Sequence, residues 1–208
     1  MASKDPLKTA LKLSLIGGVA LGGFYLAAQR ASARKMPEQH IVENVNKDRL
    51  LGTWYEIARI PNLFQGDDQV AGTDNYYPKA NGDMEVIYKY KEKSFDGPEK
   101  QMKGKLFQEP QYASTGRFKV QFFWPFNADY WIIDLDENYD YMAIGYPDRS
   151  MLWIMSRRPE MQPDVYGALL ERLKAQQYDV SRLMKIPQPD NAPVMGPPKT
   201  ATPTKSGN

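Results

Sequence analysis

The chain has 208 residues, of which 42% are hydrophobic and 12% aromatic, enough for one domain with a sizeable core plus tails. It contains no cysteine, which excludes disulfides, thiolate chemistry, cysteine-ligated metals and a lipid anchor on an N-terminal cysteine. The net charge is +2, but residues 1–35 hold six basic residues and one acid, so the remainder carries −3. A slightly acidic body argues against nucleic acid as a partner.

The N-terminal region, residues 1–35, contains a charge-free apolar run from Leu13 to Ala28, preceded by lysines and followed by the small-residue pattern Ala31–Ala33. The run is long for the apolar core of a signal peptide and short for a membrane span of about 20 residues. Basic residues flank both sides, so charge does not settle the orientation. A cleaved signal peptide and a retained membrane anchor both fit. In either case we expect an exported protein, periplasmic or anchored in the cell envelope.

From residue 52 the sequence alternates apolar and polar residues in short runs separated by turn residues. Such alternation, with one polar face, is typical of antiparallel strands. Eight strands are predicted, at residues 52–60, 71–78, 84–91, 101–108, 117–124, 130–135, 139–145 and 151–157. Eight consecutive antiparallel strands favour closure into an up-and-down β-barrel, because closure removes exposed edges. A barrel of this size holds one small ligand.

The periodicity changes at Pro163, where PDVYGALLERLKAQQ predicts an amphipathic helix that can only pack outside a closed barrel. Apolar residues at 180, 183 and 186 suggest a short ninth strand. The proline-rich residues 187–208 are predicted to form a disordered tail. The predicted fold class is therefore all-β, an eight-stranded antiparallel up-and-down barrel with one C-terminal helix outside. The barrel domain is expected to span residues 36–186.

Three motifs in order resemble those of the lipocalin family. Gly52 and Trp54 in GTWYEIAR match its G-x-W motif at the start of the first strand. Asp136 and Tyr139 in LDENY match the turn between strands six and seven, and Arg157 in LWIMSR matches the arginine that ends strand eight. The sequence is most similar to the bacterial lipocalins and apolipoprotein D, although it lacks an anchor cysteine. The resemblance implies binding of fatty acids, lysophospholipids or similar lipids for membrane maintenance.

The loops of an up-and-down barrel alternate between its two ends, so the motif residues should meet at one end. An arginine above an indole ring contributes about 0.5–2 kcal/mol. Gly52 permits a sharp turn and close backbone approach. We interpret the cluster of Gly52, Trp54, Asp136, Tyr139 and Arg157 as a structural plug that closes the barrel floor and has no catalytic role.

The loops at the opposite end are predicted to form the mouth, and they carry apolar residues at their tips. These mouth residues are Leu63, Phe64, Phe95, Trp124, Phe126 and Tyr146. Two interpretations stay open: the tips admit an apolar ligand and touch a membrane surface, or they fold back and pack on the rim.

Strand parity predicts an apolar, aromatic lining that suits an acyl chain or a flat hydrophobe, with tyrosine hydroxyls for a polar head. If Trp54 faces inward, so should Glu56 and Ala58, which lie two and four residues further along. The predicted ligand-binding residues are Trp54, Glu56, Ala58, Tyr88, Tyr90, Phe118, Val120, Phe122, Met151, Trp153 and Met155. Parity in the sixth strand is ambiguous, because YWIID is apolar on both faces.

Catalysis has little support in the sequence. The single histidine, His40, lies before the barrel, so a Ser–His triad and most zinc or haem sites are not expected. Asp67 and Asp68 are interpreted as solvated loop acids, and Asp134 and Asp136 as turn residues. The predicted function is non-enzymatic lipid binding with no cofactor or metal. A lipid-modifying enzyme with Glu56 as an interior base is the alternative, and a purely structural envelope protein is the third. The sequence specifies neither the lipid nor the oligomeric state.

Overall fold

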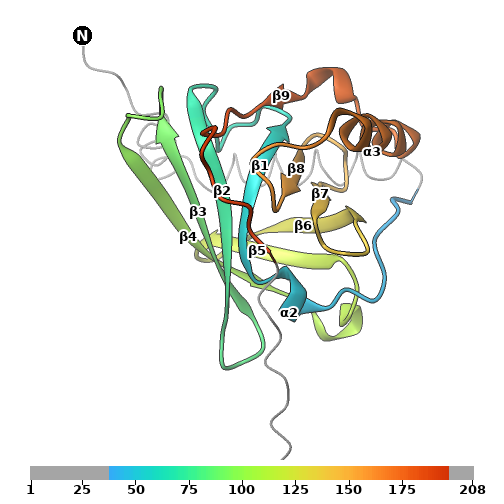
Figure 1. Cartoon of the computed structure of the whole chain (residues 1–208). Coiled ribbons are helices and arrows are strands. Elements are labelled where there is room, and N and C mark those ends of the chain that lie inside the picture. Colours follow the sequence, from blue (N-terminus) through green and yellow to red (C-terminus); the bar gives the residue numbers. More distant parts are fainter. Residues whose placement is uncertain (1–37, 197–208) are drawn as a thin grey trace, which may run out of the picture.

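The computed structural model describes residues 38–196, and Figure 1 shows a β-barrel with a helix against its outer wall. The barrel strands are β1 (Gly52–Arg59), β2 (Gln69–Pro78), β3 (Met84–Glu92), β4 (Glu99–Phe107), β5 (Arg117–Phe123), β6 (Phe126–Leu135), β7 (Tyr141–Gly145) and β8 (Leu152–Ser156). Each strand pairs antiparallel with the next, and β1 pairs with both β8 and β2. The predicted eight-stranded up-and-down barrel is therefore confirmed. The largest boundary difference is at β6, which begins four residues earlier than expected.

Two helices and a short strand complete the described fold. The short helix α2 (Lys47–Leu50) leads into β1, and α3 (Pro163–Ala175) begins at Pro163 as predicted. The short strand β9 (Met184–Lys185) pairs with the end of β1 outside the barrel. One-turn 3-10 helices, η1 (Pro110–Tyr112) and η2 (Val180–Arg182), lie in connecting segments. Among the described helices, none is long and apolar enough to cross a membrane. The apolar run near the N-terminus lies outside the described residues, so signal or anchor stays a prediction.

The apolar residues form two clusters, one inside the barrel and one between the wall and α3. Successive side chains of a strand point to opposite faces, so each strand supplies both clusters. In β6, Ile132 joins the inner cluster and Ile133 the outer one, which resolves the ambiguous parity there. Leu169 and Leu173 bury the apolar face of α3 in the outer cluster.

A β-bulge in β1 changes which face its last residues occupy. The register with β8 passes from Glu56↔Met155 to Ala58↔Ile154. The extra residue moves the side chains beyond it to the other face. Ala58 therefore packs in the outer cluster, and the buried Arg59 turns inward to Glu56. The prediction that Ala58 faces the interior is wrong, because it counted parity straight through the bulge.

The first part of the C-terminal tail is ordered along the outer wall. The Pro187 carbonyl accepts from the Ala71 amide at 2.8 Å, and the Met195 amide donates to the Arg157 carbonyl at 2.7 Å. The Tyr55 hydroxyl donates to the Pro193 carbonyl at 2.7 Å. The prediction of disorder is therefore wrong for residues 187–196, whose carbonyls and apolar side chains the barrel wall can bind despite their proline content. Residues 197–208 lie outside the described residues.

The barrel wall is uneven around its circumference. Eight residue pairs join β3 to β4, whereas three join β4 to β5, namely Lys105↔Gln121, Leu106↔Val120 and Phe107↔Lys119. Since β4 begins at Glu99, residues 99–104 extend past this short ladder toward the mouth. The seam between β4 and β5 is thus the barrel's shortest ladder.

Candidate functional site

The barrel floor is organised by Arg157, which follows β8 and is 0% exposed. Its guanidinium carbon lies 3.8 Å from the centre of the Trp54 ring. Nη1 donates to the Thr53 carbonyl at 2.7 Å, and Nη2 donates to the carbonyls of Arg49 and Leu51 at 2.8 Å each. Burial lowers the pKa of Arg157 to about 10, so it stays charged at neutral pH. The Arg157 guanidinium therefore joins the end of β8 to the segment that leads into β1.

The turn between β6 and β7 completes the floor. The Asp136 carboxylate accepts from the amides of Asn138 at 2.9 Å and Asp140 at 3.3 Å, which shapes the turn. The Tyr139 hydroxyl accepts from the Asn46 amide at 2.8 Å. Gly52 opens β1 with a φ of +88°, a conformation that suits glycine. The structure thus brings together all five residues that were expected to meet at the floor.

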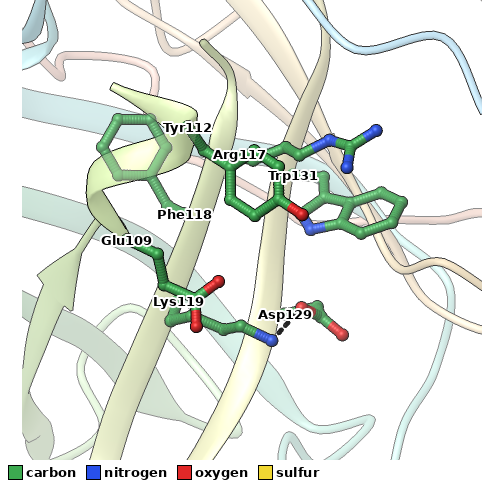
Figure 2. A pocket seen from close by; sticks show the side chains of 7 residues that line it. All are labelled: Glu109, Tyr112, Arg117, Phe118, Lys119, Asp129 and Trp131. Atoms are coloured by element: carbon green, nitrogen blue, oxygen red, sulfur yellow. Dashed lines mark hydrogen bonds and ion pairs between the residues drawn. The ribbon is translucent and has the colours of Figure 1, made fainter. Parts of the chain in front are cut away.

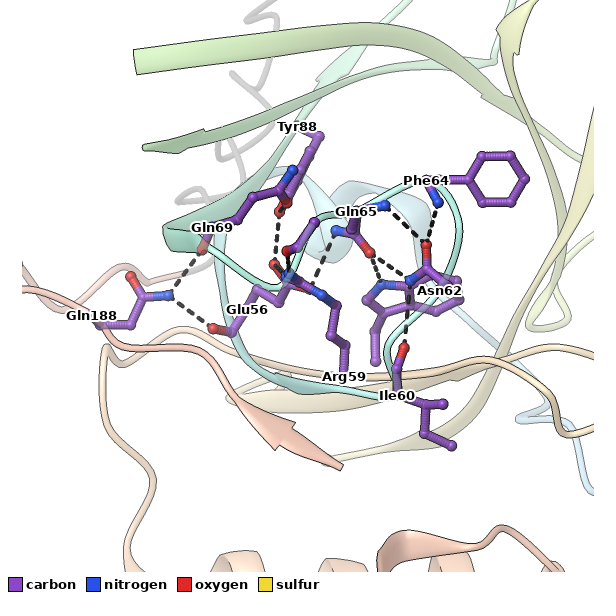
Figure 3. Close-up of polar contacts among 12 residues, drawn as sticks. Glu56, Arg59, Ile60, Asn62, Phe64, Gln65, Gln69, Tyr88 and Gln188 are labelled. Atoms are coloured by element: carbon purple, nitrogen blue, oxygen red, sulfur yellow. Dashed lines mark hydrogen bonds and ion pairs between the residues drawn. The ribbon is translucent and has the colours of Figure 1, made fainter. Parts of the chain in front are cut away.

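A buried ion pair lies in the mouth half of the interior. Arg59 Nη1 donates to both Glu56 carboxylate oxygens at 3.0 Å, with the two side chains 0% and 1% exposed. Figure 3 shows Tyr88 and Gln65 converging on the same carboxylate, at 3.0 and 3.3 Å. Burial raises the pKa of Glu56, while the positive charge of Arg59 opposes the shift. The interior is therefore less apolar than the sequence indicated.

The first mouth loop is tied to this ion pair. Gln65 Oε1 accepts from Trp153 Nε1 at 2.7 Å and from Asn62 Nδ2 at 3.0 Å, and Arg59 Nη2 donates to the Gly66 carbonyl at 2.5 Å. These contacts draw the loop into the barrel mouth. We call the set Glu56, Arg59, Gln65, Tyr88 and Trp153 the mouth latch.

A second polar group lies inside the barrel and combines a carboxylate with two tyrosines. The Tyr76 hydroxyl donates to Asp74 Oδ2 at 2.9 Å and is hydrogen-bonded to the Tyr130 hydroxyl. Burial raises the pKa of Asp74 to about 7, the nearby charge of Glu56 adds to the shift, and the bond from Tyr76 opposes it. Burial also raises the pKa of both tyrosines.

Sequence reasoning missed five of these interior groups, and each omission has a physical cause. Tyr76 faces inward because it pairs with Gly52, and the sequence does not display this register. Arg59 was hidden by the bulge, and Tyr130 by a strand that is apolar on both faces. Asp74 faces inward because it pairs with Trp54, a register that the sequence does not display. Gln65 sits in a loop, where no periodicity shows its direction.

Most of the predicted lining residues do point into the barrel. Trp54, Phe118, Val120 and Met155 belong to the inner cluster, and Phe122 and Trp153 pack against it. Tyr88 and Tyr90 are buried with their rings stacked 5.3 Å apart. Met151 is buried just before β8, in neither cluster. With Glu56 in the latch, Ala58 is the one predicted lining residue that packs outside.

The mouth carries exposed apolar tips on three loops rather than four. Leu63 is 89% and Trp124 is 85% exposed, and Phe64, Phe95 and Phe126 are exposed as well. Tyr146, expected among them, is only 6% exposed. The prediction for Tyr146 is wrong because Tyr178, which follows α3, packs beside the turn between β7 and β8 and donates to the Tyr146 carbonyl at 3.1 Å.

The candidate acids and the histidine have simple surroundings. His40, Asp67 and Asp68 are exposed, as expected. Asp134 lies within β6 and binds Arg172 of α3 at 2.7 and 3.0 Å, so the prediction that it serves a turn is wrong. Within residues 38–196, no cluster of three or more histidine, aspartate or glutamate side chains is placed to hold a metal ion.

A pocket of about 110 Å³ lies on the outer face of β5 and β6, apart from the interior groups (Figure 2). The guanidinium of Arg117 lies 4.9 Å from the Tyr112 ring centre and 5.2 Å from that of Trp131. Lys119 Nζ binds Asp129 Oδ1 at 2.6 Å. Since these cations already have partners on the pocket wall, the interior is the stronger candidate site.

An eight-stranded antiparallel barrel, sealed at one end and rimmed by loops at the other, defines the class of small-ligand-binding β-barrels. A family model described as the lipocalin-like domain matches residues 45–188. The chain belongs to the lipocalin family.

Relatives from distant organisms support this assignment. Temperature-induced lipocalin-1 of Arabidopsis thaliana is 32% identical to this chain, and the alignment covers 75% of this chain and 86% of the relative. Outer membrane lipoprotein Blc of Escherichia coli is 36% identical, and the alignment covers 72% of this chain and 82% of the relative. Bovine apolipoprotein D is 31% identical, and the alignment covers 79% of this chain and 89% of the relative. The predicted likeness to bacterial lipocalins and apolipoprotein D is confirmed.

Solved structures agree on the fold. Insecticyanin from the tobacco hornworm Manduca sexta superposes with a TM-score of 0.60 at 19% identity, covering 77% of this chain and 89% of its own. At this identity the likeness concerns the fold alone. Membership of the family implies that this chain binds a small hydrophobic ligand.

Proposed function

We propose that the barrel binds one fatty acid, lysophospholipid or similar amphiphile, and carries or stores it for membrane maintenance in the cell envelope. One observation carries the proposal: the barrel is sealed at the floor by Arg157 and Trp54, and its mouth is rimmed by exposed apolar tips. An apolar wall between a sealed floor and an apolar rim suits a chain-like hydrophobic ligand that enters at the mouth.

The burial of the inward side chains supports an interior that admits a ligand. Phe122, Tyr130 and Trp153 contact the inner cluster, yet each is only partly buried. Side chains in a filled core would lose nearly all exposure. Their residual exposure is what residues bordering an open interior would show.

Binding without catalysis is supported by the bonding of Glu56. Its carboxylate accepts from Arg59, Tyr88 and Gln65, so it is held as an ion-pair partner and not free as a base. A general base needs an open position next to the proton that it removes. The buried carboxylate is better suited to shaping the site.

Ligand extraction tests the function directly. The purified protein is extracted with organic solvent, bound lipid is identified by mass spectrometry, and added lipid is recovered after incubation. A bound amphiphile, recovered unchanged, is the expected result. Chemically altered lipid would indicate an enzyme, and no extractable or added ligand would indicate a structural protein.

The location in the cell envelope is proposed on two supports. The relative from Escherichia coli is named an outer membrane lipoprotein, and the apolar run near the N-terminus of this chain fits an export signal or an anchor. N-terminal sequencing of the mature protein would show whether residues 1–35 are removed. A cytoplasmic, unprocessed protein would contradict the proposal.

A further inference from the structure

We propose that Arg59 is the receptor for the anionic oxygen head group of the ligand, a carboxylate or a phosphate, and that Glu56 holds its guanidinium in position to receive it. The inference rests on the proposed function and adds the charge of the ligand and the residue that recognises it. The hydrocarbon tail then extends from the mouth toward the floor, among Phe118, Val120 and Met155.

The first argument is that the fold departs from regular pairing at the point that brings Arg59 inside. With simple alternation from Trp54, residue 59 would face outward, where an arginine is solvated. The bulge between Glu56 and Ala58 turns it inward and leaves it fully buried. Bulges recur beside functional sites, where they re-aim a side chain. Burial of an ion pair brings a desolvation penalty that two apolar residues would avoid, so stability alone does not explain the pair.

The second argument concerns the bonds that Arg59 makes and lacks. Nη1 donates to Glu56 and Nη2 to the Gly66 carbonyl, whereas the buried Nε has no hydrogen-bond partner among the described residues. The planar guanidinium presents its donors in a fork that matches carboxylate and phosphate. A head group therefore binds at Nε and Nη2, replacing the Gly66 carbonyl of the first mouth loop.

The third argument is that Glu56 has partners besides Arg59, which keep its carboxylate in place when a ligand binds the guanidinium. Tyr88 donates to one of its oxygens and Gln65 to the other, at 3.0 and 3.3 Å. Gly72 makes room for the carboxylate, because a Cβ there would lie 2.3 Å from Glu56 Oε2. The position of the Glu56 carboxylate thus does not depend on Arg59 alone.

The same bonds favour an anionic head group over a cationic one. A cation would have to bind Glu56, both of whose oxygens already accept hydrogen bonds from the latch. An anion finds the unpartnered Nε of Arg59 and a loop carbonyl that the head group replaces. Charge and bonding therefore select an anionic amphiphile.

The test compares two probes that share one tail. Cis-parinaric acid, a naturally fluorescent fatty acid, and its methyl ester are titrated into the full-length protein. We expect the acid to bind about tenfold more tightly, which corresponds to about 1.4 kcal/mol. Glu56→Gln, which keeps the shape but frees Arg59, is expected to bind the acid several-fold more tightly still.

A double variant keeps the test informative if single changes unfold the protein. Glu56→Gln with Arg59→Met removes both charges together, so neither is left buried and unpaired. It should bind acid and ester equally, because no charge is left to distinguish them. Arg117→Met, which removes an arginine from the outer pocket, is the matched control and should keep the tenfold preference.

Competition for bound parinaric acid separates the sources of the head group. Displacement by oleic acid indicates a carboxylate and displacement by lysophosphatidic acid a phosphate, and either supports the assignment. Oleyl alcohol displacing as strongly as oleic acid would contradict it. So would equal binding of acid and ester by the wild type, or a preference that survives in the double variant. If neither probe binds, the proposed function itself fails, and the assignment of Arg59 fails with it.

Discussion

The floor and the mouth of this barrel each bury one arginine completely, and the two are held in different ways. Arg157 at the floor donates to backbone carbonyls of the segment entering β1. Arg59 at the mouth donates to one carboxylate side chain and one loop carbonyl. Backbone carbonyls of a packed segment cannot leave, whereas a side chain and a loop can. The buried charge therefore has fixed partners at the floor and exchangeable partners at the mouth.

Removing the floor cation should have the largest effect. Arg157→Ala eliminates charge-assisted hydrogen bonds to four backbone carbonyls and the contact with Trp54, and leaves buried carbonyls without donors. We expect a loss of about 4 kcal/mol in the free energy of unfolding, a fall in melting temperature of about 10 °C. Lipid affinity of the folded variant should be unchanged. The exposed neighbour Arg158→Ala is the control. A melting temperature equal to that of the wild type would show that Arg157 does not stabilise the barrel floor.

Crowding the mouth latch should have the next largest effect. Gly72→Ala places a methyl group 2.3 Å from Glu56 Oε2, so the ion pair must shift. We expect a destabilisation of roughly 2 kcal/mol in chemical denaturation. Gly167→Ala in α3 is the matched control, because a Cβ there meets nothing within 4 Å. It should stabilise the protein by about 0.5–1 kcal/mol, since alanine favours helix. Equal effects of the two would mean that the carboxylate does not need its place beside Gly72.

Titrating Asp74, between floor and mouth, should give a smaller effect that depends on pH. Its pKa rises from 3.8 to about 7 on folding, so the unfolded chain releases this proton first as pH rises. Stability should therefore fall between about pH 4 and pH 7, by about 2 kcal/mol after allowance for partial solvation. Asp74→Asn should flatten this part of the profile in thermal melts, while the exposed Asp67→Asn should not. A profile that keeps its slope in Asp74→Asn would show that another group titrates.

The rim should show the smallest effect on stability and a separate effect on membranes. We propose that the apolar tips contact a bilayer, because Leu63 and Trp124 are the most exposed large apolar side chains of the described residues. Leu63→Ser with Trp124→Ser should change stability by less than about 0.5 kcal/mol. In protein lacking residues 1–35, it should lower co-flotation with phosphatidylcholine vesicles several-fold.

The control for the rim is an exposed aromatic residue at the opposite end. Tyr77 near the end of β2 is 46% exposed, and Tyr77→Ser should leave flotation unchanged. If the wild-type domain does not float at all, the exposed tips contact no membrane. If Tyr77→Ser lowers flotation as much as the rim variant does, the contact is not specific to the mouth.

The sequence predicts the floor better than the mouth for a physical reason. Alternation and turn residues set strand order, and strand order alone brings Trp54, Tyr139 and Arg157 together. The mouth depends on a bulge and a loop, which have no period. Alternation therefore puts Ala58 on the wrong face, does not reveal Arg59 or Gln65, and puts Tyr146 at a surface that Tyr178 covers. Regular structure is readable from spacing, whereas irregular structure depends on contacts between distant residues.

The short ladder between β4 and β5 marks where the wall can open for a ligand. Two long hairpins, β3–β4 and β5–β6, meet along only three residue pairs. Because so few pairs join them, these two hairpins can separate along this edge while the other strand pairings stay intact. The lysines at 100 and 103 discourage another strand from pairing with the exposed edge of β4. Because the part of β4 unpaired with β5, residues 99–104, lies toward the mouth, separation there would widen the mouth while the floor stays closed.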